Sequence, residues 1–241
     1  MHPKINILAF AAHPDDVEIS ASGTMIKHQK NGLTTGIIDL TRGELGTRGN
    51  AEIRLKESSI SSSILKLTIR ENLGLEDGYF ENNSNNLNSV IKCIRKYQPD
   101  IVLINAYDDR HPDHAKGHQL VKQACFLSGL PKIELLDEMN QKLEAWRPNS
   151  IYSYIQDYYI KPDIVIDVSE HWEERMKALL AYQSQFYNPN SDEPETPISS
   201  KEFLNHIEGR ASQLGRYIGA NYGEGFNVLR PIGTHLFTTL Y

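Results

Sequence analysis

The hydrophobic pattern alternates between short apolar runs and longer amphipathic stretches. Six apolar runs have the length and continuity of buried strands. They lie at residues 5–11, 33–40, 69–73, 101–104, 151–156 and 164–168. Amphipathic stretches with helix start and stop signals follow most of them. These predicted helices lie at residues 15–31, 51–67, 87–97, 112–128, 170–182 and 201–218. Strands that alternate with helices predict a mostly parallel sheet with helices on both faces.

The chain shows no division into parts. No repeat, low-complexity tract or linker interrupts its 241 residues, which are enough for one large α/β domain. We therefore expect a single Rossmann-like α/β domain over residues 1–241. In such sheets, ligands bind at the carboxyl ends of the strands where the strand order reverses. The loops that follow residues 5–11 and 101–104 are the places to look for chemistry.

Composition excludes several classes of function. A net charge of −6 gives no basic excess for binding nucleic acid. No apolar tract reaches 18 residues, and the first residues lack the pattern of a signal peptide, so we expect no membrane partner and a cytoplasmic location. No Gly-x-Gly-x-x-Gly follows the first strand, which argues against a dinucleotide cofactor. Cys93 and Cys125 are expected to be buried, reduced thiols.

Two segments rich in histidine and aspartate follow the two strands named above. The sequence AHPDD occupies residues 12–16, and DRHPDH occupies residues 109–114. Each contains His-Pro-Asp, so a proline helps to fix a histidine at a strand-to-helix turn. We expect both segments to meet at one edge of the sheet. Four histidines outside these segments have no acidic residue at ligand spacing, and we expect them to be structural. They are His28, His171, His206 and His235.

The residue types in these segments fit a catalytic metal. His13 and Asp16 are three residues apart and can aim at one point across a helix start. His114 can supply a third ligand from the other turn. Two histidines and a carboxylate, with a position left for water, form a recurrent catalytic zinc arrangement. Manganese and iron accept the same ligand set, so spacing alone does not choose the metal.

The remaining residues of the two segments suit proton transfer. Asp15 can take a proton from a metal-activated water and pass it to a leaving amine. His111 can hold a developing oxyanion or donate a proton, and we expect Asp113 to fix the tautomer of His111 and to raise its pKa. Together these residues predict a metal-dependent hydrolase.

The two segments resemble the paired signatures of the LmbE-like, or PIG-L, N-acetylglucosamine deacetylases, and the similarity covers nearly the whole chain. Longer stretches resemble the bacillithiol-pathway deacetylases of that family; they lie at residues 41–49, 72–75, 182–186 and 224–226. The resemblance implies an LmbE-like fold with one Zn²⁺ per chain, held by His13, Asp16 and His114. It implies Asp15 as the general base and His111 as the residue that stabilises the tetrahedral intermediate.

The resemblance also implies a small-molecule sugar substrate. The acetamide of N-acetylglucosaminyl malate would be hydrolysed to glucosaminyl malate and acetate in bacillithiol biosynthesis, and the enzyme would be a homo-oligomer. Arg54 matches the family arginine that binds sugar hydroxyls. Because malate carries two carboxylates, Arg42 and Arg110 are further candidates, and Glu44 can accept hydrogen bonds from sugar hydroxyls. Alternatively, these side chains pair with other charged groups of the protein.

Three other functions remain open from the sequence. The same metal centre would serve a deacetylase or amidase for another N-acetylglucosaminide or a thiol conjugate. A metal-dependent phosphoesterase has similar acidic and histidine ligands but more often binds two metal ions. A sugar-binding protein without catalysis is the third possibility. Metal stoichiometry and turnover separate these hypotheses.

Overall fold

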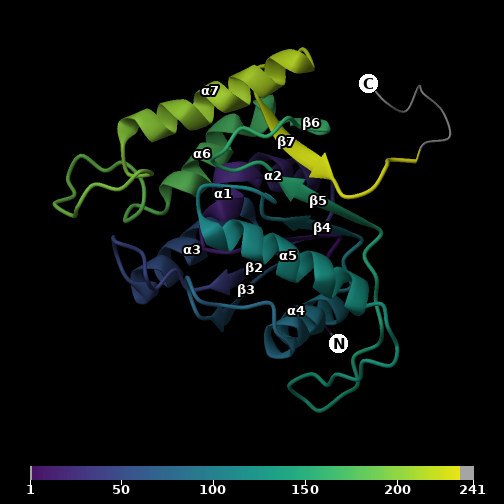
Figure 1. The fold of residues 1–241 in the computed structure, drawn as a ribbon. Coiled ribbons are helices and arrows are strands. Elements are labelled where there is room, and N and C mark those ends of the chain that lie inside the picture. Colours follow the sequence, from purple (N-terminus) through teal and green to yellow (C-terminus); the bar gives the residue numbers. More distant parts are fainter. Residues whose placement is uncertain (1, 234–241) are drawn as a thin grey trace.

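Seven strands form one sheet in the computed structural model, which describes residues 2–233 (Figure 1). The strands are β1 (Ile7–Ala11), β2 (Thr35–Thr41), β3 (Ile69–Leu75), β4 (Ile101–Ile104), β5 (Ser150–Tyr154), β6 (Ile164–Asp167) and β7 (Gly223–Val228). Their order across the sheet is β3-β2-β1-β4-β5-β7-β6. The first five run parallel, and β7 is antiparallel to both of its neighbours. The predicted mostly parallel α/β sheet is confirmed. The predicted structural residue His235 lies outside the described residues.

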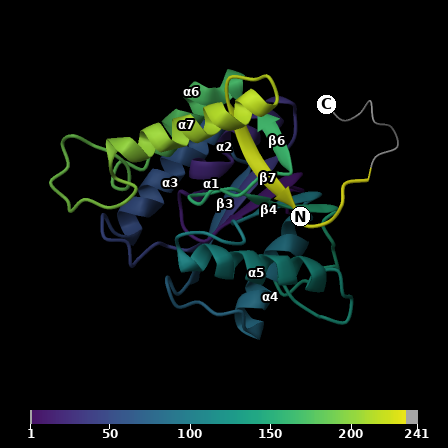
Figure 2. The ribbon, with the colours of Figure 1, turned by 45° about the horizontal axis from the view of Figure 1, so that its top comes forward.

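Helices cover both faces of this sheet. They are α1 (Asp16–Ser20), α2 (Ser22–Lys30), α3 (Ala51–Leu65), α4 (Ser84–Tyr97), α5 (Pro112–Leu127), α6 (Trp172–Leu180) and α7 (Lys201–Tyr217), with a short 3₁₀ turn, η1, at Ser169–His171. Helices α4 and α5 lie on one face, and α2, α3 and α6 lie on the other (Figure 2). Helix α7 packs beside the antiparallel end of the sheet, against β7 and β6.

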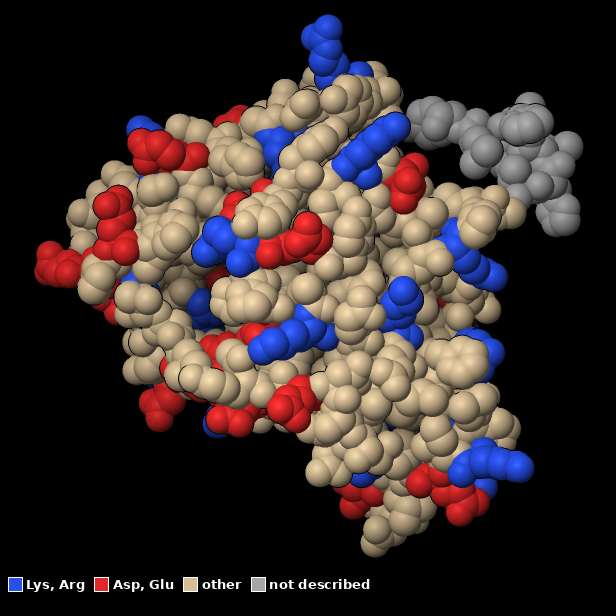
Figure 3. Space-filling view, viewed as in Figure 1, with Lys and Arg blue, Asp and Glu red and all other residues tan. Residues whose placement is uncertain are grey.

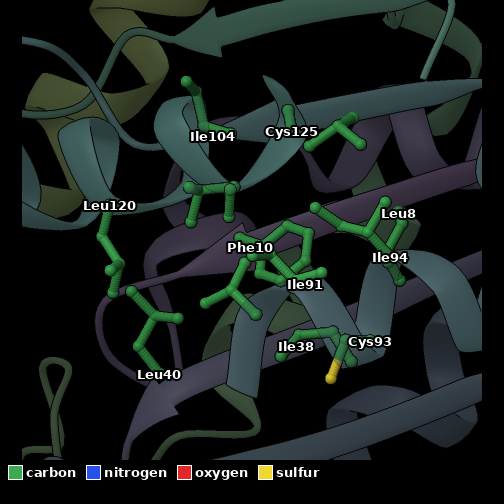
Figure 4. Close-up of a cluster of buried hydrophobic side chains, with 14 of the residues drawn as sticks. Leu8, Phe10, Ile38, Leu40, Ile91, Cys93, Ile94, Ile104, Leu120 and Cys125 are labelled. Atoms are coloured by element: carbon green, nitrogen blue, oxygen red, sulfur yellow. The ribbon is translucent and has the colours of Figure 1, made fainter. Parts of the chain in front are cut away.

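The central strand β1 is buried on both sides, which explains its unbroken run of apolar residues. Leu8 and Phe10 point to the face covered by α4 and α5, where they meet Ile91 and Leu120 (Figure 4). Ile7 and the alanines of β1 point to the opposite face. Burying a Leu, Ile or Phe side chain contributes about 1.5–3 kcal/mol. The double-sided core therefore fixes β1, and with it the loop that follows.

Cys93 and Cys125 are buried and free, as predicted. Within residues 2–233, no helix combines the length and the apolar character needed to cross a membrane.

Two predictions about elements are wrong. The single helix expected over residues 15–31 is divided at Ala21 into α1 and α2, and strand β7 was not expected at all. Both differences involve Glu224, which lies in β7. Its carboxylate accepts the backbone N–H groups of Gly23 at 2.9 Å and Thr24 at 2.7 Å, so it caps the start of α2. Arg175 donates to the same carboxylate at 3.0 Å. A distant carboxylate thus makes a second helix start where the local sequence shows none.

We predict that Glu224→Gln lowers the free energy of unfolding by about 2–3 kcal/mol, because it removes a buried charge that Arg175 and two helix N–H groups require. Urea denaturation with an unchanged dependence on urea concentration measures the loss. Glu81→Gln is the matched control, since Glu81 is exposed. Equal stability of the two variants would contradict the capping role.

Candidate active site

The two histidine and aspartate segments meet at one edge of the sheet. Residues 12–16 follow β1, and residues 109–114 follow its neighbour β4. From β1 the chain continues to β2 and β3 on one side, whereas β4 and β5 lie on the other, so the strand order reverses between β1 and β4. The segments border a pocket of about 400 Å³. The prediction that the two segments meet at one edge of the sheet is therefore confirmed.

The predicted ligand residues lie close together around Asp16. His114 Nε2 is 3.1 Å from Asp16 Oδ1, and His13 Nδ1 is 3.9 Å from Asp16 Oδ2. Two atoms that each lie about 2.0–2.1 Å from one tetrahedral ion are separated by about 3.3 Å. The distance between His114 and Asp16 is close to this value, and the distance between His13 and Asp16 is longer. In the described residues, His13, His111 and His114 also offer one nitrogen each within 4.8 Å of one another, so His111 borders the same space.

Three side chains that the sequence analysis missed hold these ligands in place. Asn105, directly after β4, donates from Nδ2 to Asp16 Oδ2 at 2.9 Å, and Gln156 donates from Nε2 to Asp16 Oδ1 at 3.1 Å. Asp109 Oδ2 is 2.5 Å from His114 Nδ1, which directs Nε2 of that ring toward Asp16. A polar residue directly after a buried strand was the available signal for Asn105.

Asp15 is held in an unusual conformation with its carboxylate in the pocket. Its backbone φ is 124°, a region that residues other than glycine rarely adopt and that is typical of strained functional positions. The side chain is buried, and its Oδ2 has no hydrogen-bond partner among residues 2–233. Burial raises the pKa of Asp15 to about 7, although the charge of Arg54, with Nη2 at 3.7 Å from Oδ2, opposes the rise. A carboxylate of this kind is suited to accept and release a proton near neutral pH.

His111 forms the N-cap of α5, and Pro112 occupies the first turn of that helix. Its Nδ1 accepts the backbone N–H of Asp113 at 3.3 Å, so Nε2 of the neutral ring carries the proton. Burial and the neighbouring rings of His13 and His114 lower the pKa of His111 to about 4. The ring is therefore neutral at pH 7 and can donate a hydrogen bond from Nε2.

The expected role of Asp113 needs correction. Its carboxylate was predicted to fix the tautomer of His111 and to raise its pKa; the backbone N–H of Asp113 fixes the tautomer instead, and burial outweighs the upward effect of the Asp113 charge on the pKa of His111. Asp113 Oδ2 instead accepts the N–H of Gly78 at 2.7 Å and lies 3.5 Å from His13 Nε2. The reason is geometric: at the start of a helix, the backbone N–H two residues after the cap faces the cap side chain.

Arg54 lies in the pocket, as predicted, and also fastens the turn that carries Asp15. Its Nη1 donates to the carbonyl of Pro14 at 3.1 Å, and its Nη2 donates to the side chain of Gln185. Gly43 has a φ of 65°, and a Cβ there would meet Arg54 Nη1 at 2.6 Å. The glycine-rich loop therefore needs glycine here for two reasons, its backbone conformation and the close approach of the guanidinium.

The other three predicted substrate residues differ in position. Arg110 borders the pocket and donates from Nε to Asp157 at 2.7 Å. Glu44 does not line this pocket; its carboxylate accepts the N–H groups of Arg42 and Asp77, each at 3.1 Å, and so braces the loop. The side chain of Arg42 lines a different pocket, beside α3 and β3. Arg42 is exposed and does not line the pocket at the predicted metal centre, and its contact with substrate stays a prediction.

The charge of the pocket suits a bound cation. Around the three histidines, five aspartates are buried, and Arg54 is the arginine in contact with one of them; the aspartates are Asp15, Asp16, Asp77, Asp109 and Asp113. Lysine and arginine are otherwise scattered among acidic residues on the face of the molecule shown in Figure 3. Buried carboxylates are costly unless they are paired or bind metal. The unpartnered oxygen of Asp15 and the nitrogen and oxygen donors beside it therefore fit a divalent metal such as zinc.

Comparison with known proteins gives this geometry a family. Residues 8–125 match the model of the PIG-L family, described as GlcNAc-PI de-N-acetylase. The conserved protein TT1542 from Thermus thermophilus superposes with a TM-score of 0.85 at 31% identity, over 95% of this chain and 97% of that one. The chain belongs to the PIG-L family.

Two curated relatives in the family carry named activities. The chain is 28% identical over 95% of its length to diacetylchitobiose deacetylase from Thermococcus kodakarensis, of which it covers 85%. It is 26% identical over 75% of its length to a probable N-acetyl-alpha-D-glucosaminyl L-malate deacetylase 2 from Bacillus anthracis, of which it covers 81%. This PIG-L family member is therefore a hydrolytic N-deacetylase.

We predict that Arg54→Met moves the acid limb of kcat/KM for deacetylation to higher pH. The charge of Arg54 lowers the pKa of Asp15, so its removal raises that pKa, and a higher pH is needed to ionise the carboxylate. A pH–rate profile measures the shift. Arg42→Met removes the same charge outside the pocket and should leave the profile in place. An acid limb that stays fixed, or moves to lower pH, in Arg54→Met would contradict the coupling.

Proposed function

We propose that this PIG-L family enzyme is a zinc-dependent deacetylase that hydrolyses the acetamide of N-acetylglucosaminyl malate, giving glucosaminyl malate and acetate as in bacillithiol biosynthesis. The observation that carries the proposal is the meeting of His13, Asp16 and His114 at the switch point of the sheet, with the unpartnered carboxylate of Asp15 beside them. When bound there, zinc would supply the Lewis acidity that makes water a nucleophile at neutral pH and polarises the acetyl carbonyl.

The chain's own residues would handle the protons. Asp15 Oδ2 accepts the proton that the attacking water loses, because the pKa of Asp15 is about 7 and no described residue donates a hydrogen bond to this oxygen. The same carboxyl group then delivers the proton to the nitrogen of the departing amine. The C–N bond breaks, and the acetyl group is released as acetate. His111 donates a hydrogen bond from Nε2 to the oxygen that gains negative charge. Arg54 keeps Asp15 facing this reaction through its contacts with Pro14 and Asp15.

Two features support malate as the aglycone. A relative named as a probable N-acetyl-alpha-D-glucosaminyl L-malate deacetylase matches three quarters of the chain. In addition, Arg110 borders the pocket and uses only Nε in its ion pair with Asp157, which leaves its two terminal nitrogens for a carboxylate. A second candidate substrate is diacetylchitobiose, because the relative with that activity matches 95% of the chain. Diacetylchitobiose has no carboxylate, so Arg110 separates the two candidates.

We predict that the zinc-loaded protein releases free amine faster from N-acetylglucosaminyl malate than from diacetylchitobiose or an N-acetylglucosaminyl inositol, and that a chelator abolishes the activity. Arg110→Gln should raise KM for the malate by about tenfold or more, since it removes a charged hydrogen-bond donor, and should leave KM for diacetylchitobiose unchanged. Amine-release assays on the three substrates measure both effects. A preference for diacetylchitobiose that Arg110→Gln does not alter would establish the second candidate instead.

We also predict that Asp15→Asn lowers kcat by about 10²–10⁴-fold, because a general base contributes an effect of this size. Asparagine tolerates the positive φ of this position, and Asp15 is not one of the proposed ligands, so the variant should keep its zinc. Zinc content is measured beside kcat. Asp16→Asn is the contrast, because it should lose zinc and activity together. Wild-type turnover in Asp15→Asn would refute the role of Asp15 as the base.

A further inference from the structure

Two buried carboxylates contact the His13 ring on the side that faces away from Asp16. His13 Nε2 lies 2.9 Å from Asp77 Oδ1 and 3.5 Å from Asp113 Oδ2. An ionised carboxylate only accepts hydrogen bonds, so the ring nitrogen between these oxygens must carry the proton. A histidine ring that binds metal is neutral, so its lone pair is then on Nδ1, which is 3.9 Å from Asp16 Oδ2. The carboxylates of Asp77 and Asp113 therefore set the orientation of the His13 ring.

Asp77 is the better placed of the two carboxylates to fix this ring. Its Oδ1 makes the shorter contact, and its Oδ2 accepts the backbone N–H of Leu45 at 2.9 Å. The N–H of Asp77 itself donates to Glu44 at 3.1 Å. Asp113, by contrast, lies farther from His13 and is engaged by Gly78 and Lys116. Asp77 therefore has three hydrogen-bond partners, which are His13, Leu45 and Glu44.

We propose that Asp77 is a positioning residue for the metal centre, which holds His13 with Nε2 protonated and presents Nδ1 to the metal beside Asp16 and His114. This inference rests on the proposed metal-dependent function. A carboxylate behind a ligating histidine fixes the tautomer and increases the basicity of the ring, and the loss of such a partner weakens metal binding by about 10–100-fold. Asp77 also ties the metal centre to Leu45, which borders the substrate pocket.

A different role for the same residues makes a distinct prediction. His13, Asp77 and Asp113 each offer one atom within 4.8 Å of the others, which is close enough to hold an ion of their own. In that arrangement Nε2 of His13 would be a ligand rather than a donor, and the chain would bind two metal ions. Stoichiometry and the metal-bound nitrogen of His13 therefore distinguish a positioning residue from a second metal site.

The first experiment measures zinc binding to metal-stripped full-length protein by competition with a chromophoric chelator, without substrate. Wild type and Asp77→Asn should each bind one zinc per chain, and Asp77→Asn should bind it about 10–100-fold more weakly. Glu76→Gln is the matched control, because it removes one carboxylate charge at the adjacent exposed position and should bind zinc as wild type does. Unchanged affinity in Asp77→Asn, or two zinc ions in wild type with one lost in Asp77→Asn, would overturn the proposal.

The second experiment needs no variant and so does not depend on the folding of Asp77→Asn. Wild-type protein labelled with ¹⁵N-histidine and loaded with ¹¹³Cd²⁺ should show coupling between cadmium and Nδ1 of His13, with a proton on Nε2. Coupling to Nε2 would overturn the proposal. If the wild-type protein binds neither zinc nor cadmium, both the proposed metal-dependent function and this inference are refuted. If the wild-type protein binds one metal ion and Asp77→Asn does not change the zinc affinity, only the inference about Asp77 is refuted.

Discussion

The burial of several carboxylates beside three histidines is the constraint on which the site depends. Each carboxylate loses its hydration on burial and must be compensated by hydrogen bonds or opposite charge. Asp16 is compensated four times, by the N–H of His13, by Asn105, by Gln156 and by the ring of His114. Asp15 is the exception, with one oxygen left unpartnered in the described residues. The contrast separates a carboxylate that is held rigidly, Asp16, from one with an oxygen free of hydrogen bonds, Asp15.

The compensating groups come from distant parts of the chain, so the geometry of the site depends on the complete fold. Gln185 donates from Nε2 to the carbonyl of Arg48 at 2.9 Å and accepts from Arg54, so the segment after α6 holds both the glycine-rich loop and the arginine beside Asp15. Beneath the site, Arg175 pairs with Glu224 and donates to the carbonyl of Ile19 at the end of α1. The short helix that carries Asp16 is thereby held at its carboxyl end by a charged side chain from the last third of the chain.

Much of the fold and the location of the site were predictable because they depend on local patterns. The continuous apolar run of β1 and the capping signal at residues 111–114 each identify an element without reference to the rest of the chain. Strand β7 gave no such signal, since Gly223 and Gly225 interrupt its pattern and it is stabilised by pairing with β5 and β6. The break at Ala21 was equally hidden, because the carboxylate that starts α2 lies about two hundred residues away.

The sequence by itself determined which two segments meet at the candidate site, because a parallel sheet brings the loops after β1 and β4 to one edge. Only the tertiary structure decided what each side chain does there. It placed Arg42 at a different pocket, used Glu44 to brace a loop, and brought the carboxylates of Asp113 and Asp77 to the ring of His13. These outcomes depend on hydrogen-bond directions and distances of a few ångströms between segments far apart in the chain, and residue spacing carries no information about them.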